Sequence, residues 1–169
     1  KNLTRKALIR AGLPVAEGDK VTKSTYLKHP LAKRPHVLKT DKGGSSIGTY
    51  IVRDPGNIVG KKVDEVFKFG LGAVIEELVE GVEITIPILD KNALTAIEIV
   101  PPPNEEFDYA NKYNGKTREI CPPKSVTKDV QNRAQEMAEI AHKQLGCRHL
   151  SRVDIILRPD NTMVLLEIN

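Results

Sequence analysis

The sequence predicts an α+β protein in which antiparallel sheets pack against helices. Apolar residues recur at helical spacing in three segments, and β-rich runs lie between and after these segments. The chain closes with two β-rich runs around Asp160-Asn161, a dipeptide that tolerates the positive φ of a tight hairpin turn. This hairpin completes a mixed α+β pattern.

The expected elements follow in chain order. The first helix has Leu3, Ala7, Leu8 and Ala11 on one face and ends before Gly12 and Pro14. A glycine-rich tip at residues 41–46 joins strands at 36–40 and 47–52. The remaining elements are a helix marked by Val59, Val63, Val66 and Phe67, strands at 73–79, 82–89 and 94–100, a polar loop at 104–116, a helix at 127–145 and the final hairpin at 152–169.

Composition narrows the class of protein. With 169 residues the chain is long enough for a core of its own. It has no apolar run of membrane-spanning length and no apolar signal-peptide core. The two cysteines, Cys121 and Cys147, lack the spacing of a metal site, so we expect them to be reduced thiols in a cytoplasmic protein. Much of the net charge of +4 comes from lysines between Lys20 and Lys42. This segment lacks the interleaved aromatics of a nucleic-acid platform and fits a small phosphorylated ligand better.

The final hairpin predicts a metal site. If Asp160 and Asn161 are the central turn residues, Asp154 lies opposite Glu167 and Arg152 opposite Asn169, all on one face. The other face would then hold Val153, Ile155, Val164, Leu166 and Ile168. Two carboxylates and a carboxamide suit Mg²⁺ held together with phosphates, and an arginine can stabilise developing charge. The alternative is a solvated polar face, and the convergence of four functional groups favours the metal.

Two further stretches suggest a nucleotide. Lys39 followed by the segment Gly43-Gly-Ser-Ser-Ile-Gly48 can surround phosphate oxygens with backbone amides, hydroxyls and one cation, although the same tip is also an ordinary flexible turn. It is not a Walker loop. The segment Glu76-Glu-Leu-Val79 can offer backbone groups to an adenine, and Glu83 can accept from a ribose. Its alternative is a plain acidic hairpin that turns at Glu80-Gly81.

Together these stretches resemble the ATP-grasp ligases, and the D-alanine–D-alanine ligase family most closely. The residues that match in order and spacing are Lys1, Lys39, Gly43 to Gly48, Glu76 to Val79, Glu83, Asp108 to Tyr113, Arg152, Asp154 and Glu167 to Asn169. The resemblance implies the ATP-grasp fold, with the nucleotide held between two α+β subdomains. It divides the chain into a starting helix and linker at 1–35, a small subdomain at 36–80 and a larger one at 81–169.

The resemblance also implies residue roles in ATP-dependent joining of two D-alanines through an acyl phosphate. The expected ATP ligands are Lys1, Lys39, Ser46, Glu76, Glu77, Val79, Glu83 and Lys112. The expected catalytic residues are Arg152 at the phosphoryl group, Ser45 in the loop over the site and Tyr113 on the mobile loop 104–116. Asp154, Glu167 and Asn169 would bind two Mg²⁺ ions, for which Mn²⁺ can substitute.

Some features depart from the family pattern and leave rival functions open. Thr40 follows Lys39 where the family usually has proline, and Glu77 stands where it often has lysine. The family's first-substrate domain and carboxyl-terminal tail do not match any part of this chain, so we expect the chain alone to bind nucleotide without useful ligation. A homodimer formed through such regions is a further expectation, with no nucleic-acid or membrane partner. The alternatives are another ATP-grasp ligase or carboxylase, a D-serine or D-lactate acceptor, and a non-catalytic nucleotide-binding module.

Overall fold

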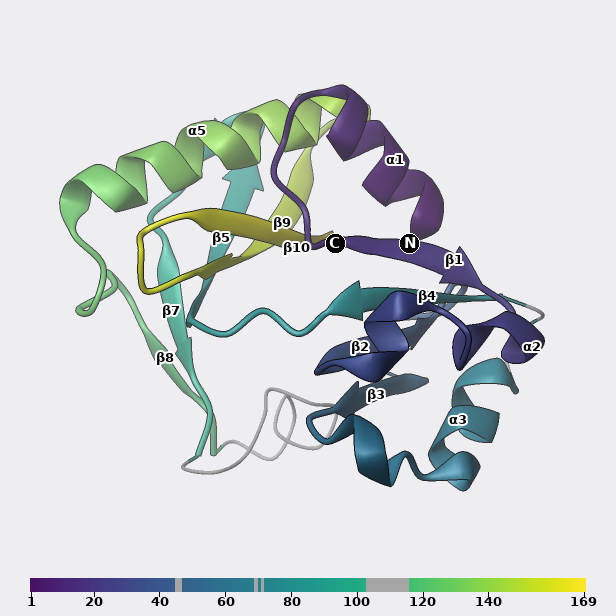
Figure 1. Ribbon diagram of the computed structural model, residues 1–169. Coiled ribbons are helices and arrows are strands. Elements are labelled where there is room, and N and C mark those ends of the chain that lie inside the picture. Colours follow the sequence, from purple (N-terminus) through teal and green to yellow (C-terminus); the bar gives the residue numbers. More distant parts are fainter. Residues whose placement is uncertain (45–46, 69, 71, 103–115) are drawn as a thin grey trace. The chain divides into compact units, whose positions relative to one another are not determined.

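The computed structural model describes residues 1–44, 47–68, 70, 72–102 and 116–169 (Figure 1). These residues form two compact units. The first unit contains Lys1–Leu3 and Ala16–Leu78, and the second contains Thr4–Val15 and Val79–Asn169. None of the described helices is long and apolar enough to cross a membrane.

The first unit is built on a four-stranded antiparallel sheet. Its strand order is β1 (Gly18–Val21), β4 (Ala73–Glu77), β2 (His36–Thr40) and β3 (Thr49–Val52). The short helices α2 (Lys23–Tyr26) and α3 (Gly60–Phe67) and the 3₁₀ turns Pro30–Lys33 and Pro55–Asn57 complete it. Leu38, Ile75 and Val66 belong to one buried apolar cluster on one face of this sheet. Because side chains alternate along a strand, Lys39 and Glu76 lie on the opposite face.

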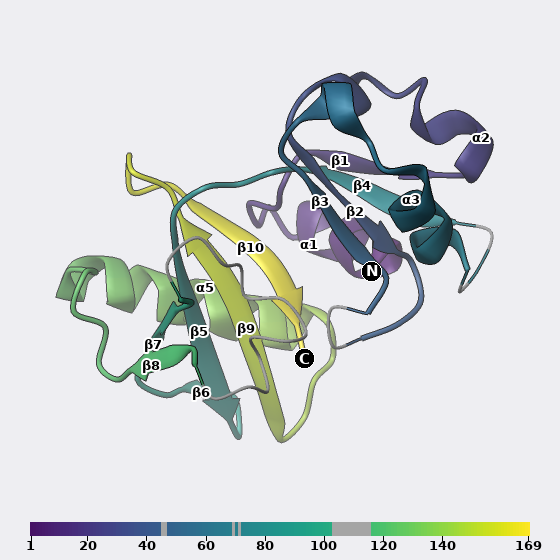
Figure 2. The same ribbon diagram turned by 90° about the horizontal axis from the view of Figure 1, so that it is seen from below.

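The second unit is a six-stranded sheet with a long helix on one face. The strand order is β10 (Met163–Ile168), β9 (Leu150–Leu157), β5 (Val82–Leu89), β7 (Ile97–Val100) and β8 (Arg118–Ile120), with β6 (Asn92–Ala93) paired to β5. Figure 2 shows β10, β9 and β5 side by side, with α5 (Lys128–Gln144) beyond them. Helix α1 (Asn2–Arg10) contributes Leu8 to the core of this unit.

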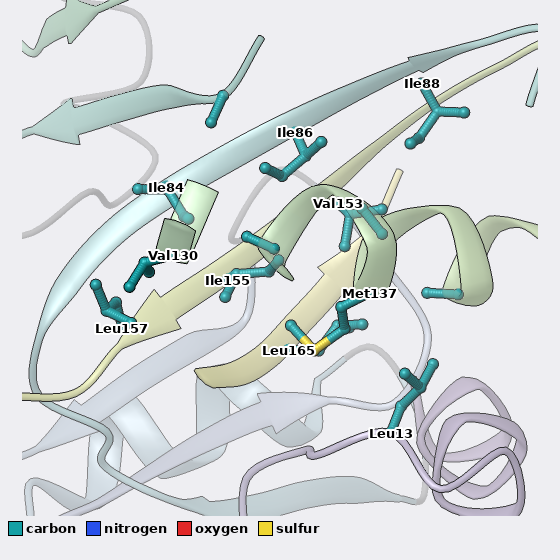
Figure 3. Packing of buried hydrophobic residues seen from close by; sticks show 14 of the residues in the cluster. Leu13, Ile84, Ile86, Ile88, Val130, Met137, Val153, Ile155, Leu157 and Leu165 are labelled. Carbon is teal, nitrogen blue, oxygen red and sulfur yellow. The ribbon is translucent and has the colours of Figure 1, made fainter. Parts of the chain in front are cut away.

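Alternation along β5 and β9 separates a core face from a polar face. Figure 3 shows Ile84, Ile86 and Ile88 of β5 and Val153, Ile155 and Leu157 of β9, whose cluster also includes Val130 and Met137 of α5. The intervening residues Thr85 and Asp154 therefore point away from this cluster. This arrangement brings polar groups of two neighbouring strands onto one surface.

The α+β class is confirmed, and most expected elements are present close to their expected bounds. Helix α5 and strand β2 match the sequence pattern, and α3 buries Val63 and Val66 as expected. The expected face of the first helix was wrong in part. Leu3 is 82% exposed, whereas Arg5 and Leu8 are the buried residues of α1.

Strand β1 was not predicted from the sequence. Its residues Gly-Asp-Lys-Val lack the apolar alternation of a half-buried strand, and within the described part of the chain β4 is its one partner, at the edge of the sheet. Gly18 is required by this pairing, because a Cβ there would lie 2.2 Å from the Ile75 carbonyl oxygen and 2.8 Å from Cγ of Glu76. The strand therefore depends on a close backbone approach that a local pattern does not reveal.

The plain acidic hairpin at Glu80-Gly81 is excluded. Strand β4 belongs to the four-stranded sheet and β5 to the six-stranded sheet, so the two strands do not pair with each other. Gly81 has a φ of 156°, and a Cβ there would lie 2.1 Å from the carbonyl oxygen of Leu157. The acidic stretch is thus a connection between two sheets that requires glycine beside β9.

The final hairpin forms, but its turn is longer than predicted. Asn161 N donates to Arg158 O, Arg158 N donates to Thr162 O, and Asn161 has a φ of 64°, which defines a three-residue loop at 159–161 rather than a two-residue turn. Pairing near the turn is therefore shifted by one residue from the predicted register, with Leu165 opposite Ile155.

A bulge between Leu165 and Glu167 restores the predicted register toward the chain end. Glu167 pairs with Asp154, and Arg152 and Asn169 exchange both backbone hydrogen bonds. The bulge changes which residues of this strand lie in the core. Leu165 is 1% exposed and belongs to the apolar cluster, in the place expected for Val164 and Leu166, neither of which belongs to that cluster.

The buried pair of Tyr26 and His36 predicts a pH-dependent stability of the first unit. His36 Nδ1 lies 2.7 Å from Arg34 O and Nε2 lies 2.7 Å from the Tyr26 hydroxyl, so a neutral imidazole can donate to the carbonyl and accept from the phenol. Burial lowers the pKa of His36 and raises the pKa of Tyr26 to about 12. Both groups are therefore neutral near neutral pH.

Acidification should destabilise the protein through His36. Below about pH 6.5 the unfolded chain binds a proton at this histidine, whereas the folded chain does not until the lower folded pKa is reached. The free energy of unfolding should therefore fall as the pH drops through this window, by at most about 1.4 kcal/mol per pH unit from this group. Urea denaturation at several pH values, compared with His36→Gln, measures this contribution. An identical pH dependence in both proteins would contradict the assignment.

Candidate functional site

Five polar residues meet on the polar face of the second unit, and we call them the Asp154 cluster. They are Thr85 of β5, Arg152 and Asp154 of β9, Glu167 of β10 and Asn169 after it. The registers place Asp154 between Thr85 on one neighbouring strand and Glu167 on the other. The position opposite Glu167 agrees with the sequence prediction, whereas Thr85 was missed.

The Asp154 carboxylate accepts hydrogen bonds from three side chains. Oδ1 accepts from Thr85 Oγ1 at 2.6 Å and from Arg152 Nε at 3.0 Å. Oδ2 accepts from Arg152 Nη2 at 3.2 Å and from Asn169 Nδ2 at 2.9 Å. A carboxylate offers about four lone-pair positions, so these bonds use its whole accepting capacity. Asp154 is 7% exposed, which makes this set of contacts well shielded from water.

The cluster keeps Arg152 positively charged. Its hydrogen bonds to Asp154 raise the pKa of the guanidinium, and the nearby charges of Asp154, Glu167 and Glu83 act in the same direction against partial burial. Glu83 lies on β5 two residues before Thr85 and so on the same face. The predicted ribose ligand and the predicted metal ligands therefore share one surface of the second unit.

The donor set of this cluster suits a hard cation held jointly with phosphates. Among the described residues there is no group of three or more His, Cys, Asp and Glu side chains that could hold a metal by itself. Asp154, Glu167 and the carboxamide of Asn169 supply only oxygen donors, and Mg²⁺ prefers a small number of protein oxygens together with substrate phosphates. The residues fit such an ion, provided that Arg152 or Asn169 releases Oδ2 of Asp154.

The first unit contains a second charged group on the polar face of its sheet. Lys39 Nζ lies 2.6 Å from Glu76 Oε2, and both side chains are largely buried. Lys20 Nζ lies 3.1 Å from Asp41 Oδ2, and Lys1 Nζ donates to the Gly43 carbonyl at 2.7 Å. The predicted phosphate ligands Lys1 and Lys39 therefore belong to the same unit as the predicted adenine ligand Glu76.

Glu77, the last residue of β4, has its backbone N–H and its side chain engaged by the segment before β1. Glu77 N donates to Glu17 O at 2.8 Å, and the Glu77 carboxylate accepts from Glu17 N at 3.0 Å. These bonds hold the segment before β1 against β4 and occupy the N–H of Glu77. Val79 follows β4 and is buried.

Four of the predicted site residues lie outside the described part of the chain. They are Ser45, Ser46, Lys112 and Tyr113. Sequence reasoning missed Thr85, and it named Lys20 only as part of the basic segment. The alternation along 82–89 was a usable signal for Thr85, since it places the hydroxyl on the face of Glu83.

Solved structures with the same fold identify the class of protein. D-alanine–D-alanine ligase from Bacillus anthracis matches all of this chain and 55% of its own length at 29% identity, with a TM-score of 0.78. The same enzyme complexed with ATP matches at 26% identity with a TM-score of 0.77, over 54% of its length. VanG D-Ala:D-Ser ligase from Enterococcus faecalis, at 24% identity and a TM-score of 0.78, shares the fold. The fold thus defines an ATP-grasp domain.

The chain belongs to the family described as D-ala D-ala ligase C-terminus, whose model matches residues 8–169. Similar proteins are the D-alanine–D-alanine ligases of Oleidesulfovibrio alaskensis, at 37% identity over 177 residues, and of Granulibacter bethesdensis, at 36% over 176 residues. Both matches include all of this chain and 55% and 56% of the relatives. The chain therefore spans about half the length of the curated relatives it matches.

Proposed function

We propose that this chain supplies the ATP- and Mg²⁺-binding part of a ligase that joins two D-alanines through an acyl-phosphate intermediate. The observation that supports this most strongly is the Asp154 cluster, in which two carboxylates, a carboxamide and a charged arginine meet within a chain of this family. The names of the relatives, and a solved relative complexed with ATP, support the substrates.

In this proposal the first unit binds the nucleotide through charge. Lys39 and Lys1 neutralise the phosphates, and Glu76 accepts from the amino group of adenine. Since Lys39 and Glu76 form an ion pair, ATP would offer each of them a new partner, a phosphate charge for Lys39 and a neutral N–H donor for Glu76. Ser45, Ser46 and Lys112 belong to the same proposed ATP ligands. Glu83 of the second unit would accept from the ribose hydroxyls.

Asp154, Glu167 and Asn169 would hold two Mg²⁺ ions, for which Mn²⁺ can substitute. Bound there, the metal supplies charge neutralisation for the transferring phosphoryl group. Arg152 is held charged by its neighbours, so it can stabilise the negative charge that develops on the phosphoryl oxygens. Tyr113 would position a substrate group.

The proposed function also implies a division into subdomains and a place of action in the cell. Residues 36–80 would be the small ATP-grasp subdomain and 81–169 the larger one, preceded by the linker at 1–35. The substrates are ATP and D-alanine, the enzyme would act in the cytoplasm to make a peptidoglycan precursor, and a homodimer would form through regions beyond this chain.

A chimera tests the ligase function. In it, residues 1–169 replace the matching segment of the Oleidesulfovibrio alaskensis ligase, so that the rest of that enzyme surrounds the proposed site. We expect phosphate release from ATP that depends on D-alanine, and its loss in the same chimera with Asp154→Asn. Release that depends on D-serine instead would reassign the acceptor. Release that is equal with and without any amino acid would contradict the ligase proposal.

The chain alone should release far less phosphate than the chimera. Alignment of donor, acceptor and phosphate can supply roughly 7–11 kcal/mol, and much of it is lost when one binding region is absent. Comparable D-alanine-dependent turnover from the chain and the chimera would show that residues 1–169 suffice.

A further inference from the structure

Thr85 is the one member of the Asp154 cluster that has no role in the function proposed above. Its hydroxyl oxygen lies 2.6 Å from Asp154 Oδ1 and 3.5 Å from the Val153 carbonyl, so its single proton goes to the carboxylate. Thr85 is 7% exposed, and its neighbours Ile84 and Ile86 are fully buried in the core. The strand therefore fixes the hydroxyl in place.

The other donors to Asp154 are more exposed than Thr85. Arg152 is nearly half exposed, Asn169 is exposed, and both would turn toward phosphate or metal in the proposed function. When they do so, Oδ2 of Asp154 loses both of its donors, and Oδ1 loses its bond from Arg152 Nε. Oδ1 keeps the bond from Thr85, because burial and branching at Cβ restrict the rotation of this side chain.

We propose that Thr85 is a positioning residue, whose hydroxyl holds Oδ1 of Asp154 so that the carboxylate presents Oδ2 alone to Mg²⁺. This inference rests on the proposed function of the Asp154 cluster. It adds a preference between ions, since Mg²⁺ demands near-octahedral geometry, whereas Ca²⁺ accepts a carboxylate through one or both oxygens. A free Oδ1 would therefore harm Mg²⁺ binding more than Ca²⁺ binding.

Two substitutions separate the hydroxyl from the shape of the side chain. Thr85→Val keeps the branched shape and removes the hydroxyl, and Thr85→Ser keeps the hydroxyl. ATP affinity is measured by calorimetry for each variant of this chain with Mg²⁺, with Ca²⁺ and with EDTA. We expect Thr85→Val to weaken Mg²⁺-dependent binding by about tenfold, as for other groups that orient a metal ligand, with a smaller loss in Ca²⁺ and none in EDTA. Thr85→Ser should stay close to the unaltered chain.

The outcomes distinguish this inference from the function on which it rests. Unaltered Mg²⁺-dependent binding in Thr85→Val would overturn the positioning role while leaving the proposed function in place. An equal loss in Mg²⁺, Ca²⁺ and EDTA would show that Thr85 only supports the fold, and would also overturn it. If the unaltered chain itself binds ATP equally with Mg²⁺ and with EDTA, the proposed metal site fails, and the role of Thr85 fails with it.

Discussion

Asp154→Asn should reduce the Mg²⁺-dependent affinity for ATP by at least about 100-fold, because it removes the central charge of the proposed metal site. The side chain keeps its shape, and Thr85 can still donate to the remaining oxygen. The new amide, however, offers protons to Arg152 and Asn169, which are themselves donors. Calorimetric titration of ATP in the presence of Mg²⁺ measures the loss.

Glu136→Gln is the matched control for this substitution. It makes the same change of charge on an exposed position of α5, the helix that covers the core face of the same sheet. We expect it to bind ATP like the unaltered chain. If Asp154→Asn binds as well as Glu136→Gln in Mg²⁺, the Asp154 cluster does not hold the metal.

Lys39→Met should reduce the affinity for ATP by about 10- to 100-fold, because hydrogen bonds to charged groups contribute roughly 1.5–3 kcal/mol. Methionine keeps the apolar stem and removes the cation that faces Glu76. If Lys39 contacts phosphate, the affinity for adenosine should change much less than the affinity for ATP. Competition with a fluorescent nucleotide measures both ligands.

Lys61→Met on the exposed surface of α3 controls for the change in net charge. We expect this variant to keep its ATP affinity. Equal losses of affinity for ATP and adenosine in Lys39→Met would show that Lys39 maintains the structure of the site and does not contact the phosphates.

Local patterns in the sequence predicted the part of the candidate site that lies within the final hairpin. Asp154 and Glu167 could be placed opposite each other because side chains alternate with period two and the hairpin is short. The turn was one residue longer than expected, yet the bulge between Leu165 and Glu167 returned the pair to register. The prediction of Leu166 in the core failed for this reason, since Leu166 is the extra residue at the bulge and has no partner on β9 in the register.

Contacts between distant segments could not be predicted in the same way. Thr85 and Asp154 are separated by 69 residues, and Lys39 and Glu76 meet only because β2 pairs with β4. Strand pairing of this kind depends on the whole sheet rather than on any short stretch. The exposed edge strand β1 escaped prediction because charged residues and a glycine replace the apolar pattern.

The central claim, that this chain binds ATP through Mg²⁺, is tested most directly by calorimetric titration of the unaltered chain with ATP in Mg²⁺ and in EDTA. The account predicts binding in Mg²⁺ that is much weaker in EDTA, because Asp154 and Glu167 add negative charge where the phosphates must lie unless a cation intervenes. Equal affinity under the two conditions, or no binding in either, would contradict it.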